Sequence, residues 1–181
     1  MNINMKDIKA IFSQYSNKIS NKNYLIIVEI SKQSLIFYKD FEEIKRYKIS
    51  TSKYGEGAEE GSNKTPLGAH YIKDYIGKDV DSLTIFQNRK PINKKTEIIK
   101  GHKYSNEDII SSRILWLEGL EEGKNKGENI DTYQRYIYIH GTNEEGMLGK
   151  KSSHGCIRMG NSDIIDLCSK EMCNIFVYIS K

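Results

Sequence analysis

A histidine and a cysteine sixteen positions apart are the residues of this 181-residue chain whose types and spacing suit chemistry best. His140 ends an apolar run, and Cys156 lies in the segment SHGCIR at positions 153–158. Cysteine attacks as the thiolate, whereas a free thiol, with a pKa of about 8.5, is mostly protonated near neutral pH. A neighbouring imidazole that takes the proton leaves a thiolate–imidazolium pair able to attack a carbonyl. Gly155 would let the backbone approach a substrate, and N–H groups around Cys156 could hold the developing oxyanion. We therefore expect cysteine-dependent acyl transfer, with Cys156 as nucleophile and His140 as its base.

Other interpretations of these cysteines and histidines have less support. The spacing alone is weak proof of catalysis because buried structural cysteines are common, and we expect that structural role for Cys168 and Cys173. A metal site would have to combine His140, His154 and Cys156, but the last two are only two positions apart and no fourth ligand is suggested. The sequence therefore predicts no metal ion and no cofactor.

The sequence around these residues resembles the L,D-transpeptidase (YkuD-type) catalytic domain family. The resemblance extends from about residue 24 to residue 179. The segments that carry it are HGT at 140–142, SHGCIRM at 153–159, EISKQSLIFY at 29–38, ISTSKYG at 49–55 and KTPLG at 64–68.

The resemblance implies an enzyme that acts on peptidoglycan stem peptides. Such enzymes cleave the bond between the L-centre of the diamino acid at position three and the following D-residue. The acyl group on the cysteine then passes to an amine, which gives a cross-link, or to water, which gives a trimmed peptide. By this resemblance Cys156 is the nucleophile, His140 the general base and the carbonyl of Gly141 the group that orients the imidazole. Gly155 and Cys156 would supply the oxyanion-hole N–H groups.

Seven further residues are expected to shape the site or bind substrate. His154 belongs to the pocket by the resemblance, although a structural role within the turn explains it at least as well. Ser153 could bond the backbone or the substrate, and a local structural role is the better explanation. Arg158 next to the nucleophile either clamps a substrate carboxylate with two hydrogen bonds or holds the carbonyls of its own loop. Thr142 is a candidate substrate-binding residue, although a local structural role explains it better. Arg113, Arg135 and Trp116 could line the substrate groove, with strand packing as the default for Trp116.

The beginning of the chain bears on whether water or an amine accepts the acyl group. Lysines, an aspartate and an asparagine interrupt every apolar run in residues 1–24, so we expect no secretory signal, and no stretch approaches the roughly 18–20 apolar residues of a membrane span. The chain therefore resembles the short, signal-less members that act as cytoplasmic L,D-carboxypeptidases and remove terminal D-Ala during wall recycling. One alternative is an L,D-transpeptidase that forms 3-3 cross-links or exchanges D-amino acids; another is a non-catalytic muropeptide-binding module. The protein would be periplasmic if a signal has been removed from the chain.

Composition and charge are those of a globular protein and give little support to nucleic-acid binding, while the basic excess is weakly compatible with an anionic, carboxylate-bearing substrate. The hydrophobic share of 38% and charged share of 29% are ordinary for a globular protein. The net charge of +4 comes from 28 basic and 24 acidic residues spread along the chain, without the basic stripe that nucleic-acid binding requires. Three cysteines cannot all pair within one molecule, which suits a reducing compartment. The sequence makes no prediction of oligomeric state.

The elements that must position these residues are mostly strands. We expect a mostly-β fold, the L,D-transpeptidase-like β-sandwich, with a short N-terminal helix and a helix after the catalytic cysteine. Residues 1–22 would form an amphipathic extension and residues 23–181 the catalytic domain. The expected helices cover residues 6–20 and 161–172, the second capped by Asn161. The expected strands cover residues 24–30, 34–39, 43–51, 69–75, 82–87, 113–117, 136–140 and 174–179.

Overall fold

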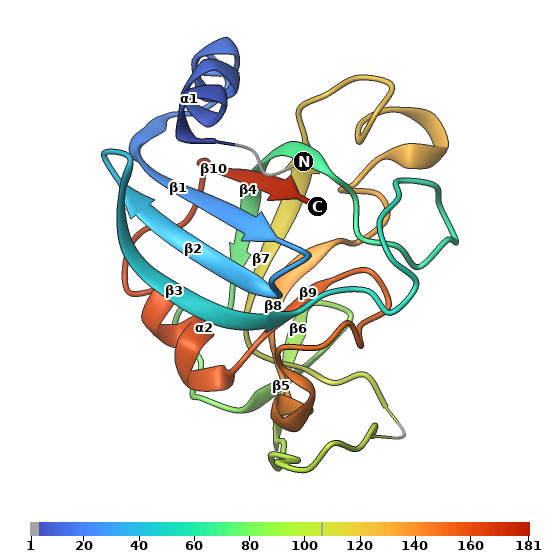
Figure 1. Cartoon of the computed structure of the whole chain (residues 1–181). Helices are drawn as coiled ribbons and strands as arrows, with labels where there is room; N and C mark the ends of the chain where they lie inside the picture. The colour runs from blue at the N-terminus through green and yellow to red at the C-terminus, as the bar shows by residue number, and fades with distance from the viewer. Residues whose placement is uncertain (1–3, 106) are drawn as a thin grey trace.

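The predicted mostly-β architecture is confirmed by the computed structural model, which describes residues 4–105 and 107–181. Two α-helices and two short 3-10 turns accompany the strands in these ranges (Figure 1). The strands are β1 (Asn21–Glu29), β2 (Ser34–Lys39), β3 (Glu42–Ser50), β4 (Gly68–Ile76), β5 (Thr84–Gln87), β6 (Lys90–Lys95), β7 (Ile110–Gly119), β8 (Tyr138–Thr142), β9 (Ile157–Met159) and β10 (Ile175–Ser180). The helices are α1 (Met5–Gln14) and α2 (Asn161–Leu167), and the 3-10 turns are η1 (Glu128–Ile130) and η2 (Glu145–Met147).

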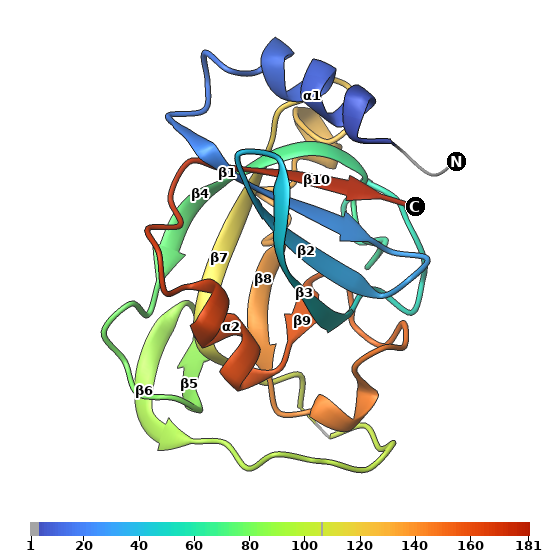
Figure 2. The same ribbon diagram turned by 60° about the vertical axis from the view of Figure 1, so that its left-hand side comes forward.

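The strands form one continuous sheet that curls back on itself. Its order is β4-β10-β1-β2-β3-β9-β8-β7-β5-β6. Because β4 also pairs with β7, the eight strands from β4 to β7 in this order form a closed ring. Most neighbours are antiparallel, whereas β1 pairs with β10, and β8 with β9, in parallel. The two layers expected of a sandwich are therefore continuous with each other, and the β5–β6 hairpin extends from β7 (Figure 2).

Helix α1 covers the outer side of the layer that contains β1, β2 and β10. It begins at the N-cap Asn4, whose Oδ1 accepts the N–H of Asp7 at 3.0 Å, and it buries Ile8 and Phe12. The prediction of a helix to residue 20 was too long: the helix ends at Gln14, and the polar residues that follow include Ser16, whose hydroxyl bonds the carbonyl of Ser13 instead. Neither helix of the described ranges is long and apolar enough to cross a membrane.

Helix α2 follows β9 directly and packs its apolar side into the main core. Ile164 and Leu167 join a cluster that includes Ile139 of β8 and Ile157 of β9. The prediction that Asn161 caps this helix and that it continues to residue 172 was wrong by one residue at the start and five at the end. Gly160 is the N-cap, which frees the Asn161 side chain for contacts described below.

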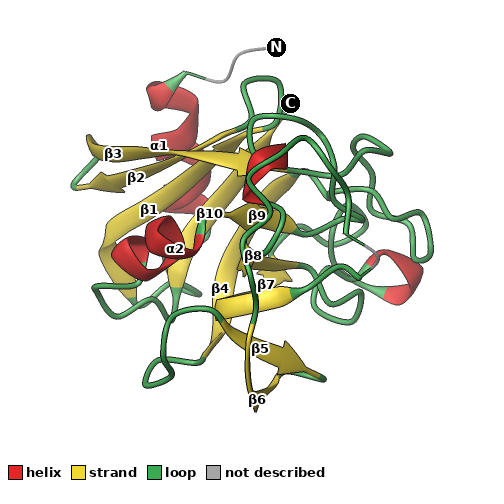
Figure 3. Ribbon diagram, turned by 90° about the horizontal axis from the view of Figure 1, so that it is seen from below, coloured by secondary structure: helices red, strands yellow, loops and turns green. Residues whose placement is uncertain are grey.

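Two strands were missed by sequence reasoning and one was displaced. β6 is lysine-rich and β9 has three residues, so neither shows the alternation of a longer strand. The strand expected at 136–140 begins at Tyr138, because Tyr136 has a φ of 58° and breaks the extended conformation. Long loops gather beside β8 and β9 (Figure 3), so the site lies where short central strands meet loops.

Candidate active site

The parallel pair β8–β9 places the three central residues of the predicted site on one face of the sheet. His140 pairs with Arg158, and Ile139 pairs with Ile157. Both isoleucines belong to the main core, so the residues beside them in each strand point to the opposite face. His140, Arg158 and Cys156 therefore share the face away from that core. The structure thus brings together side chains that lie up to eighteen positions apart in the sequence.

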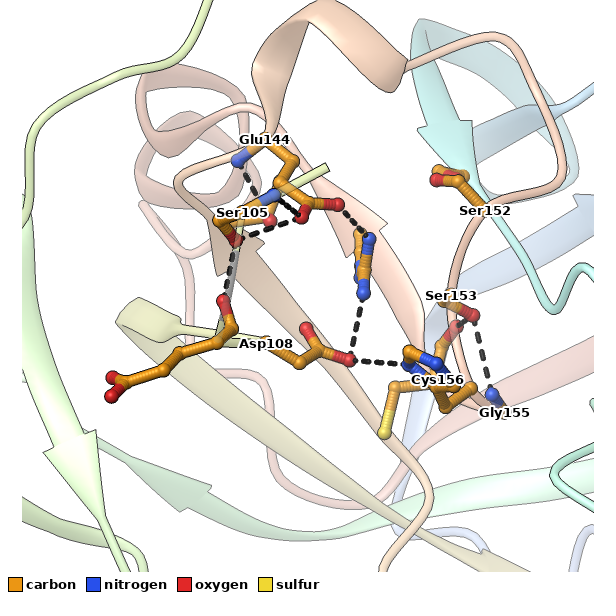
Figure 4. Close-up of polar contacts among 12 residues, drawn as sticks. Ser105, Asp108, Glu144, Ser152, Ser153, Gly155 and Cys156 are labelled. Atoms are coloured by element: carbon orange, nitrogen blue, oxygen red, sulfur yellow. Dashed lines mark hydrogen bonds and ion pairs between the residues drawn. The ribbon is translucent and has the colours of Figure 1, made fainter. Parts of the chain in front are cut away.

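The turn before β9 is held by hydrogen bonds at both of its ends (Figure 4). The hydroxyl of Ser153 donates to the carbonyl of Cys156 at 2.6 Å and accepts the N–H of Gly155 at 3.3 Å. The Thr65 hydroxyl donates to the carbonyl of Gly155 at 2.9 Å. Gly155 has a φ of 127°, a conformation that side chains rarely adopt. Ser153 and Gly155 therefore set the shape of the turn that presents Cys156.

This hydrogen bonding changes the expectation for the oxyanion hole. The N–H of Gly155, expected to face a developing oxyanion, is used by Ser153 in this structure. The N–H of Cys156, by contrast, has no hydrogen-bond acceptor among residues 4–105 and 107–181. The Cys156 N–H is thus the donor that remains open beside the thiol.

The thiol of Cys156 lies in a largely apolar setting. It packs with Ile114 and Tyr138, its Sγ accepts the N–H of Tyr138 at 3.4 Å, and it donates to the carbonyl of Tyr136 at 3.4 Å. Burial raises the pKa of the Cys156 thiol to about 12. The resting Cys156 thiol is therefore neutral, whereas the sequence predicted a thiolate.

His140 is buried and oriented by its own neighbour. Its Nδ1 lies 2.8 Å from the carbonyl of Gly141, which fixes the tautomer with the proton on Nδ1 and leaves Nε2 free to accept one. Burial lowers the pKa of His140, so the imidazole is neutral at rest. No hydrogen bond joins His140 to Cys156 in the part of the chain that the structure describes. His140 thus lies in β8 and Cys156 in the turn directly before the paired strand β9, and both groups are uncharged at rest.

A buried ionic network lies beside this pair (Figure 4). The Arg158 guanidinium, with 2% of its side chain exposed, bonds Glu144 Oε2 and Asp108 Oδ2, each at 2.7 Å. Burial raises the pKa of Asp108, but the charge of Arg158, with hydrogen bonds from Arg158 and His154, outweighs it and holds the pKa below its usual value. Glu144 also accepts both the N–H and the hydroxyl of Ser105. The network ties the segment between β6 and β7 to the catalytic strands.

The structure assigns contacts to the other predicted site residues. Arg158 binds carboxylates of the protein itself, so its side chain holds a loop in place here. His154 Nδ1 lies 3.1 Å from Asp108 Oδ2, at the edge of the network. The Thr142 hydroxyl accepts the N–H of Glu144 at 3.1 Å, a local structural bond. Arg113 is not brought to the site: it precedes Ile114, which pairs with His140, and it donates to carbonyls of the β4–β5 connection and of its own strand.

Sequence reasoning missed three residues of this site. Asp108 and Glu144 were not singled out, because acidic residues in loops are common and only the fold brings them to Arg158. Asn161 was seen as a helix cap, yet its Oδ1 accepts the hydroxyls of Ser111 and Ser112 and its amide donates to the carbonyl of Thr142. The one available signal was the arginine beside the nucleophile, which needs carboxylate partners if it is buried.

A small hollow lies beside His154, in the turn before β9, and its lining includes neither His140 nor Cys156. It has a volume of about 150 Å³ and is lined by His154, Tyr136, Arg135 and Glu60, among others. Larger hollows of about 430, 290 and 370 Å³ lie at the β5–β6 hairpin, at the loop before η1 and beside α2, and none of them includes His140 or Cys156. Within residues 4–105 and 107–181, no three His, Cys, Asp or Glu side chains are grouped as metal ligands would be.

Comparison with solved structures shows the same fold in several L,D-transpeptidases. An L,D-transpeptidase from Mycobacterium smegmatis is 14% identical with a TM-score of 0.53, over 88% of this chain and 59% of the other. L,D-transpeptidase 3 from Mycobacterium tuberculosis, solved with a faropenem-derived adduct, is 13% identical with a TM-score of 0.54, over 88% and 60%. At these identities the likeness concerns the fold alone.

Sequence comparisons identify the family. The putative L,D-transpeptidase YkuD of Bacillus subtilis is 58% identical over 36 residues, which are 20% of this chain and 22% of that protein. The chain thus matches less than two thirds of the length of each of these relatives. The family model for the L,D-transpeptidase catalytic domain matches residues 23–170, which include His140, Cys156 and the network around Arg158. The chain therefore belongs to the L,D-transpeptidase (YkuD) catalytic domain family.

Proposed function

We propose that the chain is a cysteine-dependent acyl-transfer enzyme that cleaves the L,D bond of peptidoglycan stem peptides. The observation that carries this proposal is the placement of His140 in β8 and of Cys156 in the turn that leads directly into β9, the strand that pairs with β8 in parallel. The bond from His140 Nδ1 to Gly141, which leaves Nε2 as the accepting nitrogen, is the second support. Membership of the family supplies the substrate class.

The proposed reaction begins with proton transfer within a neutral pair. When substrate binds, the thiol turns from the carbonyl of Tyr136 towards His140, whose Nε2 takes its proton while Sγ attacks the carbonyl of the L-centre. Catalytic hydrogen bonds are often absent before substrate binds, so the resting geometry permits this step. The N–H of Cys156 stabilises the oxyanion, the imidazolium protonates the departing amine, and the acyl group remains on Cys156.

We propose water as the main acyl acceptor, so that the enzyme acts as an L,D-carboxypeptidase that trims the terminal D-Ala of tetrapeptides in wall recycling. Water needs no subsite of its own beside the acyl-enzyme, whereas transpeptidation also needs a surface that holds a second stem peptide next to Cys156. His140 then acts as base towards the water that hydrolyses the acyl-enzyme.

The experiment is incubation of the purified chain with a disaccharide-tetrapeptide, with products followed by mass spectrometry. Release of D-Ala with formation of the tripeptide supports the carboxypeptidase. Incorporation of an added D-amino acid, or a dimer, supports the transpeptidase, which the names of the solved relatives favour. Labelling of Cys156 by a thiol reagent without turnover of any muropeptide supports a binding module and contradicts both activities.

A further inference from the structure

Four aromatic side chains form a surface next to the nucleophile, here called the aromatic surface: Trp116, Tyr133, Tyr136 and Tyr138. The Trp116 ring stacks on Tyr133 with centroids 4.1 Å apart and meets Tyr138 edge-on at 5.4 Å. Tyr136 tilts against Trp116 at 5.6 Å, and 52% of it is exposed. The rings are thus packed with each other while one side stays open to a ligand.

Arg89 brings a positive charge to this surface. It lies in the turn between β5 and β6, and its guanidinium is 5.3 Å from the centroid of Trp116 and 5.0 Å from that of Tyr136. Guanidinium groups stack on aromatic rings and keep their N–H edges available for hydrogen bonds. Among the described residues, no carboxylate forms an ion pair with Arg89; the groups that act on it are tyrosines. The charge is therefore held in place but not neutralised.

The aromatic surface begins at the thiol itself. The backbone carbonyl of Tyr136 accepts the Sγ proton, and the backbone N–H of Tyr138 donates to Sγ. In a tetrapeptide, the carboxylate of the leaving D-residue lies one residue beyond the scissile carbonyl, about 3.8 Å of extended chain. Tyr138 belongs to the cluster that Cys156 packs against, and it is also the group that acts most strongly on Arg89, so one aromatic side chain links the thiol to the guanidinium.

We propose that Arg89, held on Trp116 and Tyr136, binds the free carboxylate of the D-residue that leaves, and so selects stem peptides that end directly after the scissile bond. This inference rests on the proposed function and names the residue that determines its substrate class. In Arg158, the other candidate for a carboxylate clamp, both terminal nitrogens are already bonded to carboxylates of the protein, Asp108 and Glu144. An arginine–carboxylate pair gives two parallel hydrogen bonds, which a neutral amide cannot reproduce.

Binding to the unreactive variant Cys156→Ala tests the inference directly. The chain contains a single tryptophan, Trp116, so its fluorescence reports occupancy of the aromatic surface. A stem tetrapeptide with a free C-terminal carboxylate should bind about 10- to 100-fold more tightly than the same peptide with a C-terminal amide. Adding Arg89→Gln should abolish this preference. Adding Lys90→Gln, which removes a charge from an exposed neighbour on the same hairpin, should leave it intact.

Equal binding of the acid and the amide to Cys156→Ala overturns the inference without any need for a hairpin variant. An acid preference that survives Arg89→Gln, or that Lys90→Gln removes equally, also overturns it. These outcomes are distinct from failure of the proposed function: a wild-type chain that releases D-Ala but binds acid and amide equally contradicts the role of Arg89 alone. A wild-type chain that releases no D-Ala and binds neither peptide contradicts both.

Discussion

Replacing Arg158 by methionine tests whether the buried network stabilises the site as the structure indicates. Arg158 and Glu144 have only 2% and 3% of their side chains exposed, and their atoms lie 2.7 Å apart. Removing one partner of such a pair leaves the other charge buried and uncompensated, which costs about 3–5 kcal/mol in free energy of unfolding. For a domain of this size that corresponds to a fall in melting temperature of about 6–20 °C.

Asp108→Asn is the matched control for this prediction. The Asp108 side chain is 36% exposed, so its bond to Arg158 is partly screened by solvent and its loss costs about 1 kcal/mol or less. The double variant Arg158→Met, Glu144→Gln should be less destabilised than the sum of its single variants, because it removes both charges. Urea unfolding followed by far-UV circular dichroism measures all three. A loss below about 1 kcal/mol for Arg158→Met, or equal losses for Arg158→Met and Asp108→Asn, would refute the reasoning.

Three further predictions follow from burial and backbone conformation. The pKa of the Cys156 thiol is raised to about 12, so the rate of its alkylation by iodoacetamide should rise about tenfold per pH unit from pH 7 to 10. Peptide mapping measures this rate at Cys156. A plateau near neutral pH would show a thiolate–imidazolium pair instead. Burial lowers the pKa of His70 from 6.5 to about 4, so on acidification the unfolded chain takes up a proton at this residue before the folded chain does. The free energy of unfolding should therefore fall by about 3 kcal/mol as pH decreases from 6.5 to 4. His70→Gln should unfold in urea with a weaker dependence on pH over that range, and an unchanged dependence would contradict this. Gly155→Ala should reduce D-Ala release by at least about tenfold, because alanine at a φ of 127° is strained by about 1–3 kcal/mol; full activity would show that the turn is not under this constraint.

The nucleophile segment and the long strands could be predicted from the sequence because their signals are local. The run at 24–30 combines branched and aromatic residues with a turn directly after it, and β1 and β2 form that hairpin. Cys156 and His140 stood out by residue type together with the motifs HGT and SHGCIRM around them. β6 and β9 gave no such signal, because the first is largely lysine and the second is three residues long.

The ionic network could not be predicted because its bonds depend on the completed fold. Arg158 reaches Glu144 across fourteen positions and Asp108 across fifty, through loops without periodicity. The protonation state of the catalytic pair was missed for the same reason. The thiolate–imidazolium pair was inferred from residue types, whereas burial, which only the tertiary structure defines, favours the neutral thiol and the neutral imidazole.

The most direct test of the central claim is the intact mass of the chain, acid-quenched during turnover of a disaccharide-tetrapeptide. The account predicts a mass increase equal to the acyl group of the substrate without its terminal D-Ala, mapped to Cys156. The increase should be absent in Cys156→Ala, and its formation should be slowed by orders of magnitude in His140→Ala. Release of D-Ala by Cys156→Ala at the wild-type rate, without any adduct on the wild-type chain, would contradict the account.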